Sequence, residues 1–430
     1  MVNVVLVNGK VWPFFHVKKG KYRFRLVNGS NSRAYNLSLS NHATFHVIGT
    51  ELGLLRQPVS VQELTMLPGE RYEVIMDFSS YATGTELILT NDAPAPYPGF
   101  PGVGVIPNVM KFIVQAQTGF TSPIPATLAS FADILPAEAH VSRDFKLYAI
   151  MKPDCDDDHN GHGEHTMSLH PVWTINGLLW DDITEYPMEG TTEIWNWENT
   201  SGIDHPMHLH LVMTRVLDRQ PIDANGNPTG PVEPPKPYEL GWKDTWNCPT
   251  GYRTRSIARF VGFTGLYPYH CHILEHEDHE MMRQFQVVSC KEVSTLQDSG
   301  PGSLRFALDC ANAGDTIHFA PSLAGQTIQL ESAITLSKNV AIVNLPNNGV
   351  WIDGHNANSA IIVSPGVQVS LQKLNIRAGK GGTGRSIFNL GNLLLHDVNL
   401  YDTQANANTL YNGPGSSFEA KGQVRMFIQQ

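Results

Sequence analysis

"YPYHCHILEHEDHEMM", residues 267–282, places one of the five cysteines of a 430-residue chain between two histidines. The stretch begins as a short β-strand. On a strand, successive side chains point to opposite faces, so Cys271 faces one way while His270 and His272 face the other. One short strand of a β-fold would therefore present ligands to two different metal centres.

Two later residues complete a possible site around Cys271. His276 and Met281 follow five and ten residues after the cysteine, at spacings that allow the chain to fold back towards it. One Cys, two His and a weak axial Met form the ligand set of a blue electron-transfer copper site. Zinc is the rival metal, but structural zinc sites favour several closely spaced cysteines. For Met281, packing after a short turn is the alternative interpretation.

A second segment, "DHPMHLHL" at 204–211, supplies the remaining histidines. His208 and His210 share one strand face, whereas His205 has the opposite parity. We therefore expect His205 to join the thiolate site and the other two to join the histidines on either side of the cysteine.

The composition bounds the class of protein. A chain of 430 residues predicts two or three domains. Few charged residues (16%) with 37 Gly and 28 Pro indicate many short strands and turns. The net charge of −10 argues against a nucleic-acid partner. No apolar run of about 18 residues is present, so we expect no membrane span.

Alternation and turn residues divide the chain into four parts. Residues 1–120 alternate in the manner of a β-sandwich, and 121–140, rich in Pro, Ala, Ser and Thr, read as a linker. Residues 141–290 form a second β-rich block that holds both histidine segments. In 291–430, short strands recur at roughly 20-residue intervals with Gly and Asn at the turns, which is typical of stacked parallel coils.

Other potential ligands lie outside these motifs. The loop "DCDDDHNGHGEH" at 154–165 is interpreted as a solvated acidic loop rather than an accessory copper or calcium site. Its histidines are His159, His162 and His165. The sequence does not show which of the remaining cysteines form disulfides with one another. These are Cys155, Cys248, Cys290 and Cys310.

"HPMHLH" and "HCHILEHEDHEMM" resemble the two C-terminal copper motifs of multicopper oxidases, particularly the bacterial spore-coat laccase and bilirubin oxidase branch. The likeness extends to "VLVNGKVWPFFHVKKGKYRFRLVNGSNSRAYNLSL", "LPGERYEVIMDF" and "GTTEIWNWEN", and covers about residues 1–290. It implies two cupredoxin-like Greek-key β-sandwich domains, family domains 2 and 3, the first without copper ligands. With the coils that follow, the expected fold class is all-β, ending in a partial right-handed parallel β-helix.

The same resemblance implies a role for each ligand. The type 1 copper ligands are His205, Cys271 and His276, with Met281 axial. The type 2 copper ligand is His208. The ligands of the type 3 copper pair are His210, His270 and His272. Glu277 matches an acidic position that helps deliver protons to oxygen, with a solvent-exposed carboxylate as the alternative.

The resemblance implies a laccase-like oxidase. A small reducing substrate, such as a phenol, an aromatic amine, a bilirubin-like pigment or a low-valent metal ion, gives single electrons to the type 1 copper. Electrons then pass from Cys271 through the strand to His270 and His272, and a trinuclear cluster reduces dioxygen to water. The alternatives are an electron-transfer or binding protein with a single type 1 copper and an adhesive tail, or an inactive fragment.

Part of the family's ligand set is missing. A complete cluster takes eight histidines, four of them from two His-X-His pairs in an N-terminal cupredoxin domain. The only His-X-His patterns here are "HLH" and "HCH", and His42 and His46 have the wrong spacing. We therefore expect domains 2 and 3 without domain 1. Three explanations remain open: a separate polypeptide, a truncated reading frame, or loss of oxygen reduction.

The tail suggests a location. "DSGPGSLRFALDCANAGDTIHF" resembles the opening of the pectate-lyase-like β-helix repeats of bacterial surface proteins. The candidate lyase residues form no convincing constellation: Asp353, His355, Arg377 and Lys380. We interpret the tail as an adhesion, anchoring or spacer module that contacts a cell surface or polysaccharide. A secreted, periplasmic or cell-surface location is expected, although "MVNVVLVNGKVWPFF" lacks the features of a signal peptide.

Overall fold

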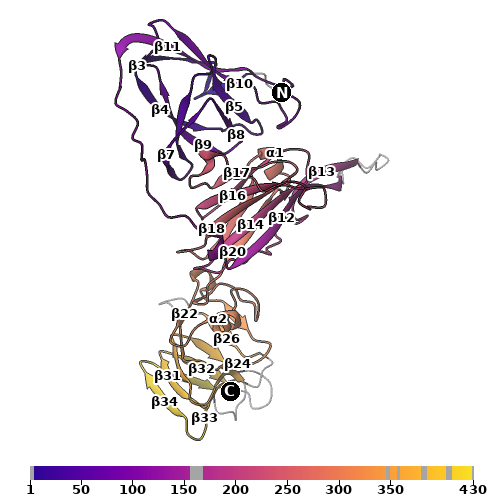
Figure 1. The fold of residues 1–430 in the computed structure, drawn as a ribbon. Helices are drawn as coiled ribbons and strands as arrows, with labels where there is room; N and C mark the ends of the chain where they lie inside the picture. Colours follow the sequence, from indigo (N-terminus) through magenta and orange to yellow (C-terminus); the bar gives the residue numbers. More distant parts are fainter. Residues whose placement is uncertain are drawn as a thin grey trace. The chain divides into compact units, whose positions relative to one another are not determined.

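The computed structural model describes residues 4–154, 168–344, 349–355, 359–378, 385–402 and 409–428. Its regular elements are almost all strands, which confirms the all-β prediction. The chain divides into two compact units (Figure 1). The first is Met1–Gly262 with Leu266–Gln286, and the second is Phe263–Gly265 with Val287–Gln430.

The first unit begins with a β-sandwich. A short hairpin precedes it, formed by β1 (Leu6–Val7) and β2 (Lys10–Val11). One sheet has the order β3 (Phe14–Lys19), β11 (Asn108–Thr118), β10 (Glu86–Asn91), β5 (Tyr35–Leu39) and β8 (Glu63–Met66). The other has the order β4 (Lys21–Val27), β9 (Arg71–Asp77), β6 (Phe45–Thr50) and β7 (Gly53–Val61). Tyr72, Val74 and Met76 alternate with more exposed residues along β9, so one face of this strand fills the core.

A second sandwich follows the coil that contains the short turn η1 (Pro136–Glu138). Its larger sheet has the order β13 (Ser168–Ile175), β12 (Val141–Asp154), β14 (Thr192–Asn199), β18 (Tyr252–Arg259) and β16 (Thr214–Pro221). Its smaller sheet has the order β17 (Thr245–Cys248), β15 (His205–Leu209), β19 (Gly265–Cys271) and β20 (Met282–Val287). A second short turn, η2 (Pro237–Glu239), precedes β17.

Buried aromatic rings fill the space between these two sheets. Phe145 stacks on Trp197 with ring centroids 4.6 Å apart, and Trp195 meets Tyr269 edge-on at 5.5 Å. Because Trp195 and Trp197 lie two residues apart on β14, both face inward, and Tyr269 of β19 is held from the other sheet. The ligand-bearing strand β19 is therefore anchored by its own core residues.

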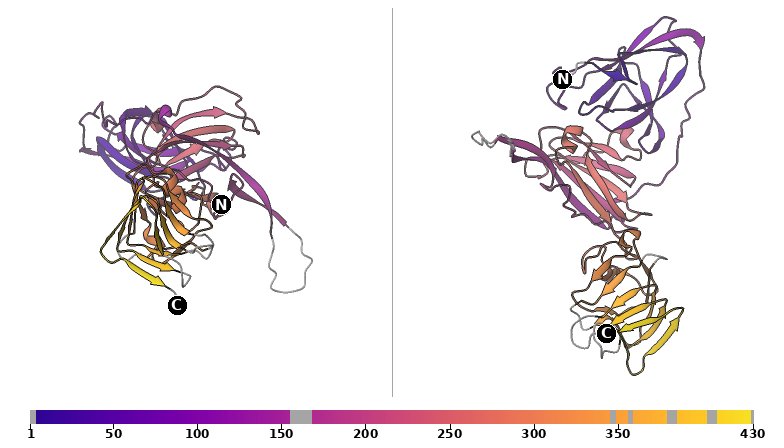
Figure 2. Two further views of the ribbon diagram at one scale, coloured as in Figure 1. Left: turned by 90° about the horizontal axis from the view of Figure 1, so that it is seen from below. Right: turned by 180° about the vertical axis from the view of Figure 1, so that it is seen from behind.

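The strands β12 and β13 extend beyond the rest of their sheet (Figure 2). β14 pairs with β12 only from Val141 to Leu147. From Tyr148 to Asp154, β12 pairs with β13 alone among the described strands.

The second unit is a parallel β-solenoid with three sheets. The first sheet is β21 (Glu292–Val293), β22 (Thr316–Phe319), β25 (Val340–Val343), β28 (Gln368–Gln372), β31 (Asn392–His396) and β34 (Ser417–Lys421). The second is β23 (Thr327–Gln329), β26 (Trp351–Asp353), β29 (Asn375–Arg377), β32 (Asn399–Asp402) and β35 (Arg425–Ile428). The third is β24 (Ile334–Leu336), β27 (Ser359–Val363), β30 (Arg385–Asn389) and β33 (Leu410–Asn412).

The coils are longer than the sequence indicated. Ile317, Ile342, Leu371 and Leu395 occupy successive equivalent positions, separated by 25, 29 and 24 residues. The expected interval of roughly 20 residues was therefore too short. The turns between the strands differ in length and carry little hydrophobic signal, which explains the error.

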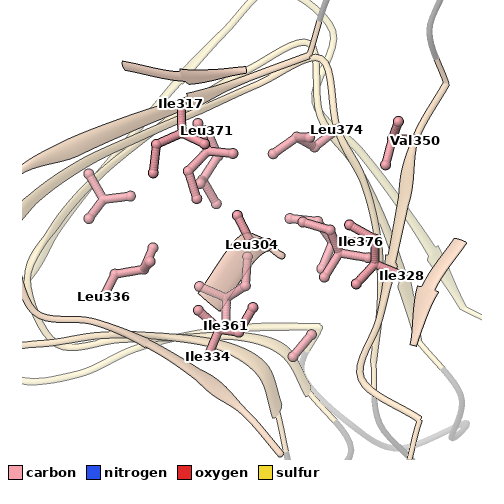
Figure 3. Close-up of a cluster of buried hydrophobic side chains, with 14 of the residues drawn as sticks. Leu304, Ile317, Ile328, Ile334, Leu336, Val350, Ile361, Leu371, Leu374 and Ile376 are labelled. Atoms are coloured by element: carbon pink, nitrogen blue, oxygen red, sulfur yellow. The ribbon is translucent and has the colours of Figure 1, made fainter. Parts of the chain in front are cut away.

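A helix that the sequence analysis did not predict closes one part of the solenoid core. α2 (Leu304–Cys310) begins after Ser303, whose hydroxyl accepts a hydrogen bond from Phe306 N. Figure 3 shows Leu304 pointing between side chains of all three sheets, such as those of Ile317, Ile328 and Ile334. The turn η3 (Pro321–Leu323) follows β22. A disulfide joins Cys290 to Cys310 at the end of α2.

No helix among the described residues is long and apolar enough to cross a membrane.

Candidate metal centre

The ligand segments meet because β15 lies between β17 and β19. β15 and β19 are antiparallel, with Met207 opposite Cys271 and His208 opposite His270. Neighbouring residues on each strand point to opposite faces. The pairing therefore sorts the side chains of both segments into two groups, one on each face of the smaller sheet.

The first group contains His205, Cys271 and His276, all buried. The Cys271 Sγ lies 3.5 Å from His205 Nδ1 and 3.7 Å from His276 Nδ1. The two Nδ1 atoms are 3.2 Å apart. His276 reaches this position from α1 (Leu274–Glu277), the short helix that follows β19.

The donor chemistry of this triangle fits a copper ion. The centre of the triangle lies roughly 2 Å from each donor atom, close to the length of a metal–imidazole bond. Ser201 Oγ directs its hydrogen to Asn199 Oδ1, so it accepts from His205 Nε2–H, 2.9 Å away. The Nδ1 lone pair of His205 is then free to bind a metal.

Burial keeps both imidazoles neutral. It lowers the pKa of His276 to about 4, with His279 adding a smaller effect in the same direction. Burial also lowers the pKa of His205 well below its usual value, and His276 contributes. Burial raises the pKa of the Cys271 thiol, so the metal-free site carries a protonated thiol at neutral pH.

Two further residues surround this group. Met281 is fully buried, and its backbone oxygen accepts a hydrogen bond from Cys271 N at 3.0 Å. The loop from His276 to Met281 therefore does fold back towards the cysteine. Trp173 of β13 stacks on the His276 ring at 4.3 Å and meets His205 edge-on at 5.2 Å. Trp173 was not predicted, since no local signal in the sequence connects it to the histidines.

The second group lies on the other face and contains His208, His210 and His270, whose donor atoms fall within 4.8 Å of one another. The Nε2 atoms of His210 and His270 are 3.3 Å apart. The His272 ring lies 5.7 Å from that of His208 and 5.5 Å from that of His270. Burial lowers the pKa of His270 to about 3, so this imidazole is also neutral.

Glu277 lies against this second group. One of its oxygens is 3.4 Å from His270 Nδ1, and the carboxylate is partly exposed. Burial raises its pKa, and the neighbouring Asp278 adds to the effect. The contact places a titratable carboxyl group beside a candidate ligand.

Among the described residues, the other sequence candidates do not join these groups. Asp353 pairs with Arg377 at 3.1 Å in the solenoid, and its carboxylate accepts from His355 N. Lys380 and Cys155 lie outside the described residues. The three histidines of the acidic loop also lie outside them: His159, His162 and His165. Cys248 is a buried free thiol on β17, opposite His205.

Comparison with known proteins gives the family. Sequence models of multicopper oxidases match residues 2–93 and 159–290. A laccase of Bacillus subtilis is 40% identical over 297 residues, which are 66% of this chain and 54% of that protein. A laccase of Haloferax volcanii is 33% identical over 66% of this chain and 47% of its own length. The chain thus spans about half the length of the curated relatives it matches.

Solved structures agree. The McoA multicopper oxidase of Aquifex aeolicus has a TM-score of 0.53 and 30% identity, over 66% of this chain and 59% of that one. The sandwiches, the buried group around Cys271 and the histidines on the opposite face define a cupredoxin-like copper protein. The chain belongs to the multicopper oxidase family. Copper is the cofactor that this membership implies.

Proposed function

We propose that this chain is the copper-binding part of a laccase-like oxidase that removes single electrons from phenolic or related small molecules and passes them to dioxygen. In this proposal the first group, His205, Cys271 and His276, holds the type 1 copper, with Met281 as axial ligand. His208 serves the type 2 copper, and the type 3 pair is served by His210, His270 and His272. When bound, copper supplies the one-electron chemistry that side chains lack, including reduction of dioxygen to water at the trinuclear site.

One observation carries the proposal. Cys271 contributes its sulfur to one group, while its immediate neighbours contribute imidazoles to the other. Only covalent bonds of the strand separate the two groups. An electron that arrives at the buried thiolate therefore has a short, fully bonded path to His270 and His272.

Glu277 would serve the oxygen chemistry. Reduction of dioxygen to water consumes protons, and burial, which raises the pKa of the Glu277 carboxyl group, makes this group a better proton donor for that reaction. Its position 3.4 Å from His270 and its partial exposure connect the buried group to solvent.

We further propose that the remaining cluster ligands come from a separate N-terminal cupredoxin domain, and that the protein acts in a secreted, periplasmic or cell-surface location. Multicopper oxidases of similar sequence are the support for both statements. In this proposal the solenoid contacts a cell surface or polysaccharide. Without the additional ligands we expect little oxygen consumption by this chain.

Copper titration of the whole chain tests the proposal. One equivalent of Cu(II) should produce an intense blue absorption, because a thiolate–copper bond carries strong charge transfer. Cys271→Ser should abolish the colour, whereas Cys248→Ser, a control at another buried thiol, should retain it. A colourless native protein, or a blue Cys271→Ser variant, would contradict the assignment.

Oxygen uptake tests the second half of the proposal. The blue protein should consume little oxygen with a phenolic substrate until a His-X-His-containing cupredoxin domain is added. Rapid turnover by the chain alone would refute the need for a partner domain.

A further inference from the structure

The first sandwich contributes no described residue to either group of candidate ligands, but one of its turns lies against the histidines. This turn, residues 67–71, joins β8 to β9. Its last residue, Arg71, makes a two-point ion pair with Asp244, with NH1 2.7 Å from Oδ1 and NH2 2.6 Å from Oδ2. NH1 also donates to Gly69 O at 3.1 Å, so the guanidinium is held from both sides.

Asp244 and Thr245 hold His208 in turn. His208 Nδ1 lies 2.9 Å from the backbone oxygen of Asp244 and 2.9 Å from Thr245 Oγ1. A carbonyl oxygen can only accept, and the Thr245 hydroxyl directs its hydrogen to Asp244 Oδ1 at 2.8 Å. Both neighbours therefore require a proton on Nδ1, which leaves the lone pair of His208 on Nε2.

The same turn also lies against His272. Gly69 has φ +80°, and a Cβ atom at this position would stand 2.2 Å from Cδ2 of the His272 ring and 2.4 Å from Cγ. No side chain fits in that space. The glycine is thus required by the backbone conformation and by the imidazole together.

We propose that the 67–71 turn positions the second group of candidate ligands. Arg71, acting through Asp244, selects the His208 tautomer that presents Nε2. Gly69 leaves room for the His272 ring. The role of a sandwich without ligands is then to orient ligands of its neighbour. The use of this orientation in catalysis rests on the proposed function, but the tautomer is a property of the metal-free chain.

The first test needs no metal. In the whole chain labelled with ¹⁵N-histidine, long-range ¹H–¹⁵N spectra should show His208 as a single tautomer with its proton on Nδ1. Arg71→Met keeps most of the side-chain stem but removes the ion pair, and should give a mixture of tautomers. Arg25→Met is the matched control, since Arg25 pairs with Glu73 at 3.0 Å on the exposed side of the same sheet. The control should leave His208 unchanged.

The second test measures the affinity of the chain for a second copper ion. The second equivalent of Cu(II), distinguished from the blue site by electron paramagnetic resonance, should bind about 10- to 100-fold more weakly to Arg71→Met, as expected when an outer partner of a metal-bound histidine is lost. Arg71→Lys, which keeps the charge but not the fork, should fall between the two. The blue absorption should be the same in all variants.

Three results would overturn the inference: an unchanged tautomer in Arg71→Met, an unchanged affinity for the second copper, or an equal loss of the blue site, which would indicate general unfolding rather than positioning. A native chain without any blue site would instead refute the proposed function, and the metal-free spectra would still decide the tautomer.

Discussion

Replacement of the buried Lys243 by methionine tests how the two sandwiches are held together. The ammonium group is fully buried, 2.9 Å from Glu51 Oε1 and 3.3 Å from Glu70 Oε1. It also donates to the Tyr72 hydroxyl at 3.1 Å. Lys243 belongs to the second sandwich and its three partners to the first. Lys243→Met keeps the volume of the side chain but leaves the carboxylates without their cation.

The expected loss is large because the buried carboxyl groups of Glu51 and Glu70 lose the cation that pairs with them. Removal of one partner of a buried ion pair costs about 3–5 kcal/mol of unfolding free energy. The loss should also depend on pH. Burial raises the pKa of Glu51 to about 7, although Lys243 opposes this shift. A carboxyl group whose pKa is higher in the folded protein than in the unfolded chain stabilises the folded state at pH values below its unfolded-state pKa. This stabilisation is lost as the pH rises through its folded-state pKa.

The variant should therefore diverge from the native protein above about pH 7. There the native carboxyl ionises beside Lys243, whereas in Lys243→Met its pKa rises further and it stays protonated. The variant should then lose about 1.4 kcal/mol more than the native protein for each pH unit.

Urea unfolding followed by tryptophan fluorescence measures this difference, since every tryptophan except Trp351 lies in the first unit. Lys111→Met is the control, because its pair with Glu86 at 2.9 Å is largely exposed and should contribute less than about 1 kcal/mol. Equal stability of Lys243→Met and native protein, or parallel pH curves, would refute the reasoning.

Three further predictions concern the copper site and the solenoid. Binding of Cu(II) to the group of His205, Cys271 and His276 at pH 7 should release one proton, because the Cys271 thiol is protonated there and both imidazoles are neutral. Calorimetry in buffers of different ionisation enthalpy measures the number of protons released. Release of no proton would contradict the pKa shifts. Cys310→Ser, which opens a link between residues 20 apart, should destabilise the second unit by about 3 kcal/mol in chemical unfolding and leave the first unit unchanged. Leu304→Ala should cost about 2–5 kcal/mol in the second unit, because Leu304 is buried among all three sheets; a loss below about 1 kcal/mol in the same assay would mean that α2 is not part of the core.

Several features follow from the sequence because they are local. The pleat of a strand separates Cys271 from His270 and His272 wherever that strand is placed. The same rule separates His205 from His208 and His210. The all-β fold and the repeated coils were predicted for the same reason, since alternation and turn residues act over a few positions. The coil length was not, because turns of variable length carry no periodic signal.

Other features needed the folded chain. Trp173 covers the His276 ring, and Arg71 reaches Asp244 across 173 residues of sequence. Neither contact leaves a mark in its own segment, because both depend on how separate sheets pack. The amino-acid sequence by itself determined which atoms are available as ligands and on which strand face each lies. Only the tertiary structure decided which of them come within bonding distance and which tautomer they adopt, because distances between sheets and the partners of a buried imidazole are set by packing.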